Sequence, residues 1–172
     1  PEGTPNQVAA DSSLQWRLPG YNAGSVGGRG HLSAASHHIP EFIGSYRIIR
    51  KLGAGGMGAV YEAIDDHIAN RAAIKILHAE WSMKKDIADR FFNEARAANI
   101  IRHPGIVTIS QFGHLPSGSA YIVMEYLDGA SLRQRLEGGV TRLQALRLAR
   151  QLASALAAAH AKKIIHRDLK PD

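Results

Sequence analysis

Four glycines lie close together in the segment Gly53-Ala54-Gly55-Gly56-Met57-Gly58, which has the spacing G-x-G-x-x-G. Glycine lets bare backbone N–H groups approach an anion such as a phosphate. The β-type residues that follow predict a second strand and not a helix, which excludes a dinucleotide-binding loop. No Lys-Ser or Lys-Thr follows the last glycine, as a P-loop requires. A phosphate-binding hairpin tip and a merely flexible hairpin turn therefore both remain open.

Two charged residues lie in otherwise apolar patterns. Lys75 interrupts the run 72–77, and strand alternation places it on the same face as Ala73. Glu94 follows Ile87 by seven residues and precedes Ala98 by four, so it shares their helical face. A charge on an apolar face needs a partner or must extend to water. The two residues are either an ion pair that holds an amine against an anion, or two unrelated charges that reach solvent.

A third group is the segment His166-Arg167-Asp168-Leu169-Lys170-Pro171-Asp172. It combines a candidate base, Asp168, with two cations and a proline that stiffens the loop. No metal site is predicted among these residues.

The elements that must position these groups follow from local periodicity. Alternating or β-rich runs predict five strands, and apolar residues at helical spacing predict helices. Asp86 is expected to cap the first long helix. The predicted strands cover residues 46–52, 59–64, 71–77, 106–112 and 120–125, and the predicted helices cover residues 86–101, 131–136 and 141–161.

Composition limits the remaining classes of protein. The 172 residues include no cysteine and carry a formal net charge of +6. The bases are dispersed and aromatic residues are few, so we predict no nucleic-acid partner. No apolar run is long enough for a membrane span. Residues 1–41 are rich in Gly, Pro and Ser and predict a disordered leader, in which His31, His37 and His38 are more typical of solvated residues than of a metal site.

The three motifs together resemble the N-terminal half of a eukaryotic-type protein kinase, in its bacterial Ser/Thr branch. The sequences of residues 52–61 and 121–129 are similar to those of that branch. The resemblance divides residues 42–172 into an N-lobe (42–124), a hinge (125–129) and a partial C-lobe (130–172). It implies an α+β fold, with a five-stranded antiparallel sheet and one packed helix followed by a truncated helical stub.

The resemblance also implies a nucleotide site. ATP and Mg²⁺ would be the cofactors, with the metal ligands beyond Asp172. Lys75 would contact the α- and β-phosphates, and Glu94 would orient it. The remaining nucleotide contacts would come from the strand residue Leu52, the glycine segment Gly53, Ala54, Gly55, Gly56, Met57 and Gly58, the adenine-packing Val60 and Ala73, the gatekeeper Met124, and the backbone of Glu125 and Leu127.

The implied reaction is phosphorylation of Ser or Thr hydroxyls in a protein substrate. Asp168 would orient the hydroxyl and accept its proton, and Lys170 would steady the transferring phosphate. Arg167 implies control through a phosphorylated activation loop. The family pattern continues with a magnesium-binding Asn and a D-F-G segment, which these 172 residues do not contain. We therefore expect this segment of a longer reading frame to be inactive and poorly soluble alone.

Two alternative functions and one departure from the family pattern accompany this interpretation. The chain could be a non-catalytic, truncated kinase remnant that binds nucleotide weakly or serves as an interaction module. A small-molecule phosphotransferase fits less well, because Lys170-Pro171 after Asp168 is typical of protein kinases. Lys163 stands where the family often has a Gly at the end of the long helix. We expect a cytoplasmic location. In bacterial relatives a membrane helix often follows the kinase domain, so the parent protein could be anchored to the membrane by such a helix.

Overall fold

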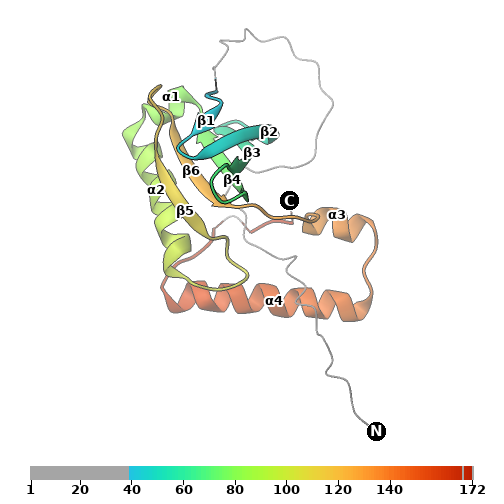
Figure 1. Ribbon diagram of the computed structural model, residues 1–172. Coiled ribbons are helices and arrows are strands. Elements are labelled where there is room, and N and C mark those ends of the chain that lie inside the picture. Colours follow the sequence, from blue (N-terminus) through green and yellow to red (C-terminus); the bar gives the residue numbers. More distant parts are fainter. Residues whose placement is uncertain (1–38, 168, 172) are drawn as a thin grey trace.

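The computed structural model describes residues 39–167 and 169–171, so most of the predicted leader, with its three histidines, lies outside the described residues. Its main feature is an antiparallel sheet in the strand order β1-β2-β3-β4-β6-β5 (Figure 1). The strands are β1 (Phe42–Ile43), β2 (Tyr46–Gly55), β3 (Gly58–Asp65), β4 (Asn70–Leu77), β5 (Ile109–His114) and β6 (Ala120–Glu125).

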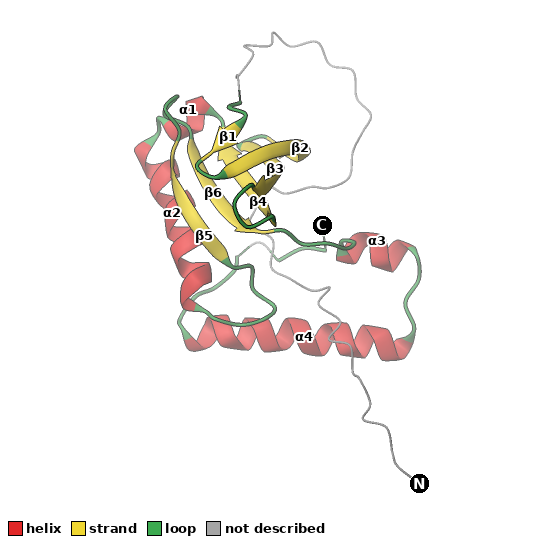
Figure 2. Cartoon of the chain, in the orientation of Figure 1, coloured by secondary structure: helices red, strands yellow, loops and turns green. Residues whose placement is uncertain are grey.

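Four helices accompany the sheet in the described part of the chain (Figure 2). The helix α2 lies along the sheet beside β5 and β6, and α4 runs below the sheet, across the end of α2. The bounds are α1 (Ala79–Ser82), α2 (Lys85–Ile100), α3 (Leu132–Glu137) and α4 (Arg142–Ala161). None of these helices combines the length and the apolar composition that crossing a bilayer requires.

The α+β class is confirmed, but the predicted number of strands is wrong by one. The sixth strand is β1, which pairs with the start of β2 across a tight turn at Gly44, where φ is +60°. The strand β5 also begins at Ile109 and not at residue 106. The side-chain amide of Asn99 accepts from the Ile109 N–H and donates to its carbonyl, which fixes this start against α2.

The helix starts differ in how they are capped. The predicted cap Asp86 is wrong, because the N-cap of α2 is Lys84, which makes no side-chain capping bond. Asp86 lies instead in the first turn, where its charge favours the helix dipole. The helices α3 and α4 both begin with a capping box, in which a hydroxyl and a glutamine satisfy two backbone N–H groups; the pairs are Ser131 with Gln134 and Thr141 with Gln144.

The sheet buries apolar side chains on both faces. One face packs against α2 and includes Val60, Ala73, Leu77, Phe91, Phe92, Ala95, Ile122 and Met124. The opposite face includes Ile43, Ala59, Tyr61, Ala63, Ile74, Leu115 and Val123. A third, smaller cluster joins the end of α2 to α4 through Ile101, Ile106, Ala155 and Ala159.

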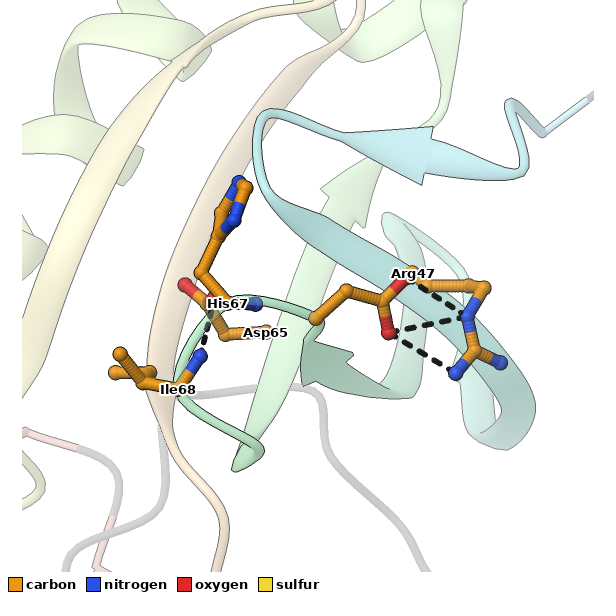
Figure 3. A network of polar contacts seen from close by, with 5 residues as sticks. Arg47, Asp65, His67 and Ile68 are labelled. Carbon is orange, nitrogen blue, oxygen red and sulfur yellow. Dashed lines mark hydrogen bonds and ion pairs between the residues drawn. The ribbon is translucent and has the colours of Figure 1, made fainter.

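Two adjacent aspartates fix the turn that joins β3 to β4 (Figure 3). Asp65 accepts from the backbone N–H groups of His67 and Ile68 and from the Ser45 hydroxyl, and these bonds lower its pKa, the Ser45 bond most. Asp66 forms an exposed ion pair with Arg47 of β2. The turn is thereby fastened to the neighbouring strand, which helps to hold the β3–β4 register.

The end of α4 carries a non-glycine residue in a left-handed conformation. Lys163 has φ +59°, its N–H donates to the His160 carbonyl, and the Ile164 N–H donates to the Ala159 carbonyl. This pair of bonds is the Schellman arrangement, which strongly favours glycine at the Lys163 position.

We predict that Lys163→Gly raises the free energy of unfolding by about 1 kcal/mol, because glycine removes the left-handed strain. Urea unfolding of the 172-residue chain, followed by circular dichroism, measures the change. Lys162→Gly is the matched control, since Lys162 has φ −95° and glycine relieves nothing there. Unfolding midpoints that move together for the two variants would contradict the prediction.

Candidate functional site

The glycine segment forms the end of a β-hairpin, as its flanking residues predict. Gly53, Ala54 and Gly55 complete β2 and pair with Val60, Ala59 and Gly58 of β3. Only Gly56 and Met57 form the turn itself. Both turn residues are exposed, so the hairpin presents backbone at its tip with little side-chain cover.

Gly58 has a packing requirement that Gly56 lacks. It is buried, and a Cβ built on it would collide with the backbone carbonyl oxygen of Ile76 on β4. A Cβ on Gly56 would meet nothing within 4 Å. The close approach of β3 to β4 at Gly58 therefore depends on glycine, because any side chain there must displace backbone atoms.

The predicted adenine-packing residues come together on the face of the sheet that α2 covers. Val60, Ala73 and Met124 are buried in one cluster, and Leu52 packs against it partly buried. They come from β2, β3, β4 and β6, and Ala73 pairs directly with Met124 across the sheet. Strand alternation explains this arrangement, because paired residues in neighbouring strands point to the same face.

Lys75 lies on that same face and is almost completely buried, with 6% of its surface exposed. It pairs with Val60 on one side and with Ile122 on the other. Its Nζ atom lies 5.5 Å from the ring centroid of Phe91, which places the amine against α2. Burial lowers the pKa of Lys75 to about 8, and the negative charge of Glu94 opposes that shift.

Glu94 follows Phe91 on α2 by three residues, so the two side chains lie on neighbouring positions of the helix surface. The residue is exposed, although its neighbours Phe91 and Ala95 are buried. Partial desolvation of the carboxylate raises its pKa, and the charge of Lys75 counteracts this. The two charges interact at a distance, since the ion pairs among the described residues do not include one between them.

The predicted hinge begins at the end of β6 and is fastened to the segment before β5. Glu125 uses both its backbone N–H and its carboxylate for Thr108: the N–H donates to the Thr108 carbonyl, and the carboxylate accepts from the Thr108 N–H. Leu127 is partly buried two residues further on. These bonds hold the hinge backbone at one edge of the face that carries Ala73 and Met124.

A buried carboxylate that the motif analysis did not single out lies beside this hinge. Glu62 is 5% exposed and forms ion pairs with Arg50 and Arg71, at N–O distances of 2.7 Å. Burial opposes its charge, and the two arginines outweigh burial, so the pKa of Glu62 is lowered. The Arg71 guanidinium also lies 3.9 Å above the ring centroid of Tyr126 in the hinge. Strand alternation places Glu62 on the same face as Val60, so the sequence alone indicates a carboxylate on this face.

The terminal loop carries the remaining predicted residues, of which the structure describes Arg167 and Lys170. Asp168 lies outside the described residues. Its neighbour Arg167 has φ +62°, a strained conformation of the kind that often accompanies functional loops. Lys170 is exposed, and the Pro171 carbonyl accepts from the Arg133 N–H at the start of α3. The loop is thus attached to α3, directly after the hinge.

Comparison with known proteins agrees with this arrangement. Residues 46–172 match the family described as the protein kinase domain. Serine/threonine-protein kinase Pkn1 of Myxococcus xanthus is 44% identical over 129 residues, which are 75% of this chain and 18% of that protein. Serine/threonine-protein kinase PknA of Mycobacterium tuberculosis is 37% identical over 134 residues, which are 74% of this chain and 31% of that protein.

The solved structures include the crystal structure of the Mycobacterium tuberculosis PknI kinase domain. It superposes with a TM-score of 0.63 and 26% sequence identity over 80% of this chain and 56% of that one. The sheet and its packed helix thus define a protein-kinase-like N-lobe, which a short helical part follows. The chain belongs to the protein kinase domain family, and the two curated relatives described above are bacterial Ser/Thr kinases. It spans less than a third of the length of the two curated relatives described above.

We predict that Gly58→Ala lowers the free energy of unfolding by about 2 to 3 kcal/mol, because the new methyl group forces β3 away from β4. Gly56→Ala is the matched control and is expected to change stability by less than about 0.5 kcal/mol. Urea unfolding monitored by circular dichroism measures both. Equal stability of the two variants would show that the close contact at Gly58 does not exist.

Proposed function

We propose that this chain binds ATP on the face of the sheet that carries Lys75, and that it does so as part of a Ser/Thr protein kinase. The observation that carries the proposal is the buried lysine amine, on the same face as Val60, Ala73 and Met124 and on the strand next to the glycine hairpin. A protonated amine attracts an anion more strongly in a partly desolvated site than in water. Nucleotide phosphates are anions that a glycine hairpin also suits.

The roles in binding follow from this placement. Lys75 contacts the α- and β-phosphates, and Glu94 orients the amine through its charge. The glycine hairpin covers the phosphates with backbone N–H groups. Adenine packs between Leu52, Val60, Ala73 and Met124, and the backbone of Glu125 and Leu127 forms its hydrogen bonds.

The roles in catalysis rest on the family resemblance. Asp168 orients the substrate hydroxyl and accepts its proton, and Lys170 steadies the transferring phosphate. The residues that the structure describes gather no group of three or more side chains that could hold a metal ion. We assign the Mg²⁺ ligands to the Asn and the D-F-G aspartate of the family pattern, which these 172 residues do not contain.

We therefore propose that the 172 residues by themselves bind the nucleotide but do not transfer its phosphate. The alternative, a non-catalytic nucleotide-binding or interaction module, uses the same face of the sheet. Adding the residues that carry the family's Asn and D-F-G separates the two functions, since only the kinase then transfers phosphate to a protein hydroxyl.

We predict that ATP affinity is constant up to about pH 7 and falls by up to roughly tenfold per pH unit above pH 8. In the chain without nucleotide, Lys75 loses its proton near its pKa of about 8. A bound phosphate favours the protonated amine and raises that pKa. The affinity is therefore lost as pH rises through the pKa of the free chain. Equilibrium dialysis with radiolabelled ATP measures it.

Lys75→Met should abolish measurable ATP binding while the chain stays folded by circular dichroism. Lys51→Met is the matched control, because Lys51 is an exposed lysine on β2 and should leave the affinity and its pH dependence unchanged. ATP binding that survives in Lys75→Met with an unaltered pH profile would refute the proposed function.

A further inference from the structure

The tip of the glycine hairpin makes a contact that neither the family motifs nor the roles above include. The indole Nε1–H of Trp81 donates to the carbonyl oxygen of Gly56 at 2.9 Å. The backbone N–H of His78 donates to the adjacent carbonyl of Met57 at 3.0 Å. Both turn residues are thus bonded to the segment that follows β4.

The helix that carries Trp81 is itself anchored to the sheet. Ser82 is buried, and its hydroxyl oxygen accepts from the Ala120 N–H at the start of β6 at 2.9 Å. The same hydroxyl donates to the His78 carbonyl at 3.2 Å. The short helix α1 therefore presents the indole from a fixed base, although α1 alone has too few residues for independent stability.

The position of α1 determines the side of the sheet toward which the hydrogen bond from Trp81 holds the glycine turn. Within the chain α1 leads directly into α2, and Figure 1 shows α1 at the upper end of α2. The helix α2 covers the face of the sheet on which Lys75 lies. The Lys84 amine at the start of α2 lies 4.4 Å from the centroid of the Trp81 ring, a cation–π contact. The indole therefore links the turn to the helix end on the Lys75 side.

We propose that Trp81 is a positioning residue that holds the glycine turn over the phosphates of the bound nucleotide. The inference rests on the proposed ATP site and adds a residue to it. The exposed turn has little side-chain packing of its own, since a Cβ on Gly56 would meet nothing within 4 Å. Fixing the turn before the nucleotide arrives removes part of the ordering cost that binding would otherwise include.

The test uses the 172-residue chain with Trp16→Phe, which leaves Trp81 as the one tryptophan. A second protein carries Trp81→Phe as well, which keeps an aromatic ring and removes the N–H donor. ATP affinity is measured by equilibrium dialysis, and solvent exchange of the Trp81 indole proton is measured by NMR without nucleotide. Urea unfolding checks that both proteins are equally folded.

We expect the indole proton to be protected from exchange, and ATP to change the Trp81 fluorescence. Trp81→Phe should weaken ATP binding by roughly three- to tenfold, the range expected for one hydrogen bond, without a matching loss of stability. Unchanged ATP affinity in Trp81→Phe would overturn the positioning role, and an indole proton that exchanges like that of a free tryptophan would overturn the contact itself. If the Trp16→Phe chain binds no ATP, the proposed function fails and takes the nucleotide role of Trp81 with it, while a protected indole still supports the contact.

Discussion

A lysine amine buried beside the Phe91 ring, and influenced by the charge of Glu94, is the constraint on which the candidate site depends. Burial lowers the pKa of Lys75 from 10.5 to about 8. Between these values the unfolded chain binds more protons than the folded chain, so stability rises with pH in that window. Below pH 8 the charged amine costs about 3 kcal/mol. In the proposed ATP complex, a phosphate beside the amine would recover part of this free energy.

The surrounding sheet must hold the Lys75 amine in place although burying its charge is unfavourable. Lys75 is paired on both sides within the sheet, and α2 covers it through Phe91. The cluster of Glu62, Arg50 and Arg71 joins the same strands to the hinge through Tyr126. Such an ion cluster adds little net stability, because desolvation offsets attraction. Its effect is to hold Tyr126 in the segment after β6, the predicted hinge, whose backbone we propose as the adenine-binding site.

Much of this arrangement could be predicted from local pattern, and the exceptions have physical reasons. Strand alternation fixes the side on which Lys75 lies, so its face was predictable. Helical spacing predicts Glu94 on the buried face of α2, but the residue is exposed. The elements β1 and α1 are too short to show a period, so local pattern does not predict them. The Trp81 contact joins residues 25 positions apart, and no spacing rule indicates such a contact.

The most direct test of the account is the pKa of Lys75 itself. NMR titration of the ¹³Cε resonance, assigned by comparison with Lys75→Met, measures it with and without ATP. The account predicts a value near 8 in the free chain and an increase of at least about one unit when ATP is bound. An ordinary lysine pKa of about 10.4 in the free chain, unchanged by ATP, would contradict it.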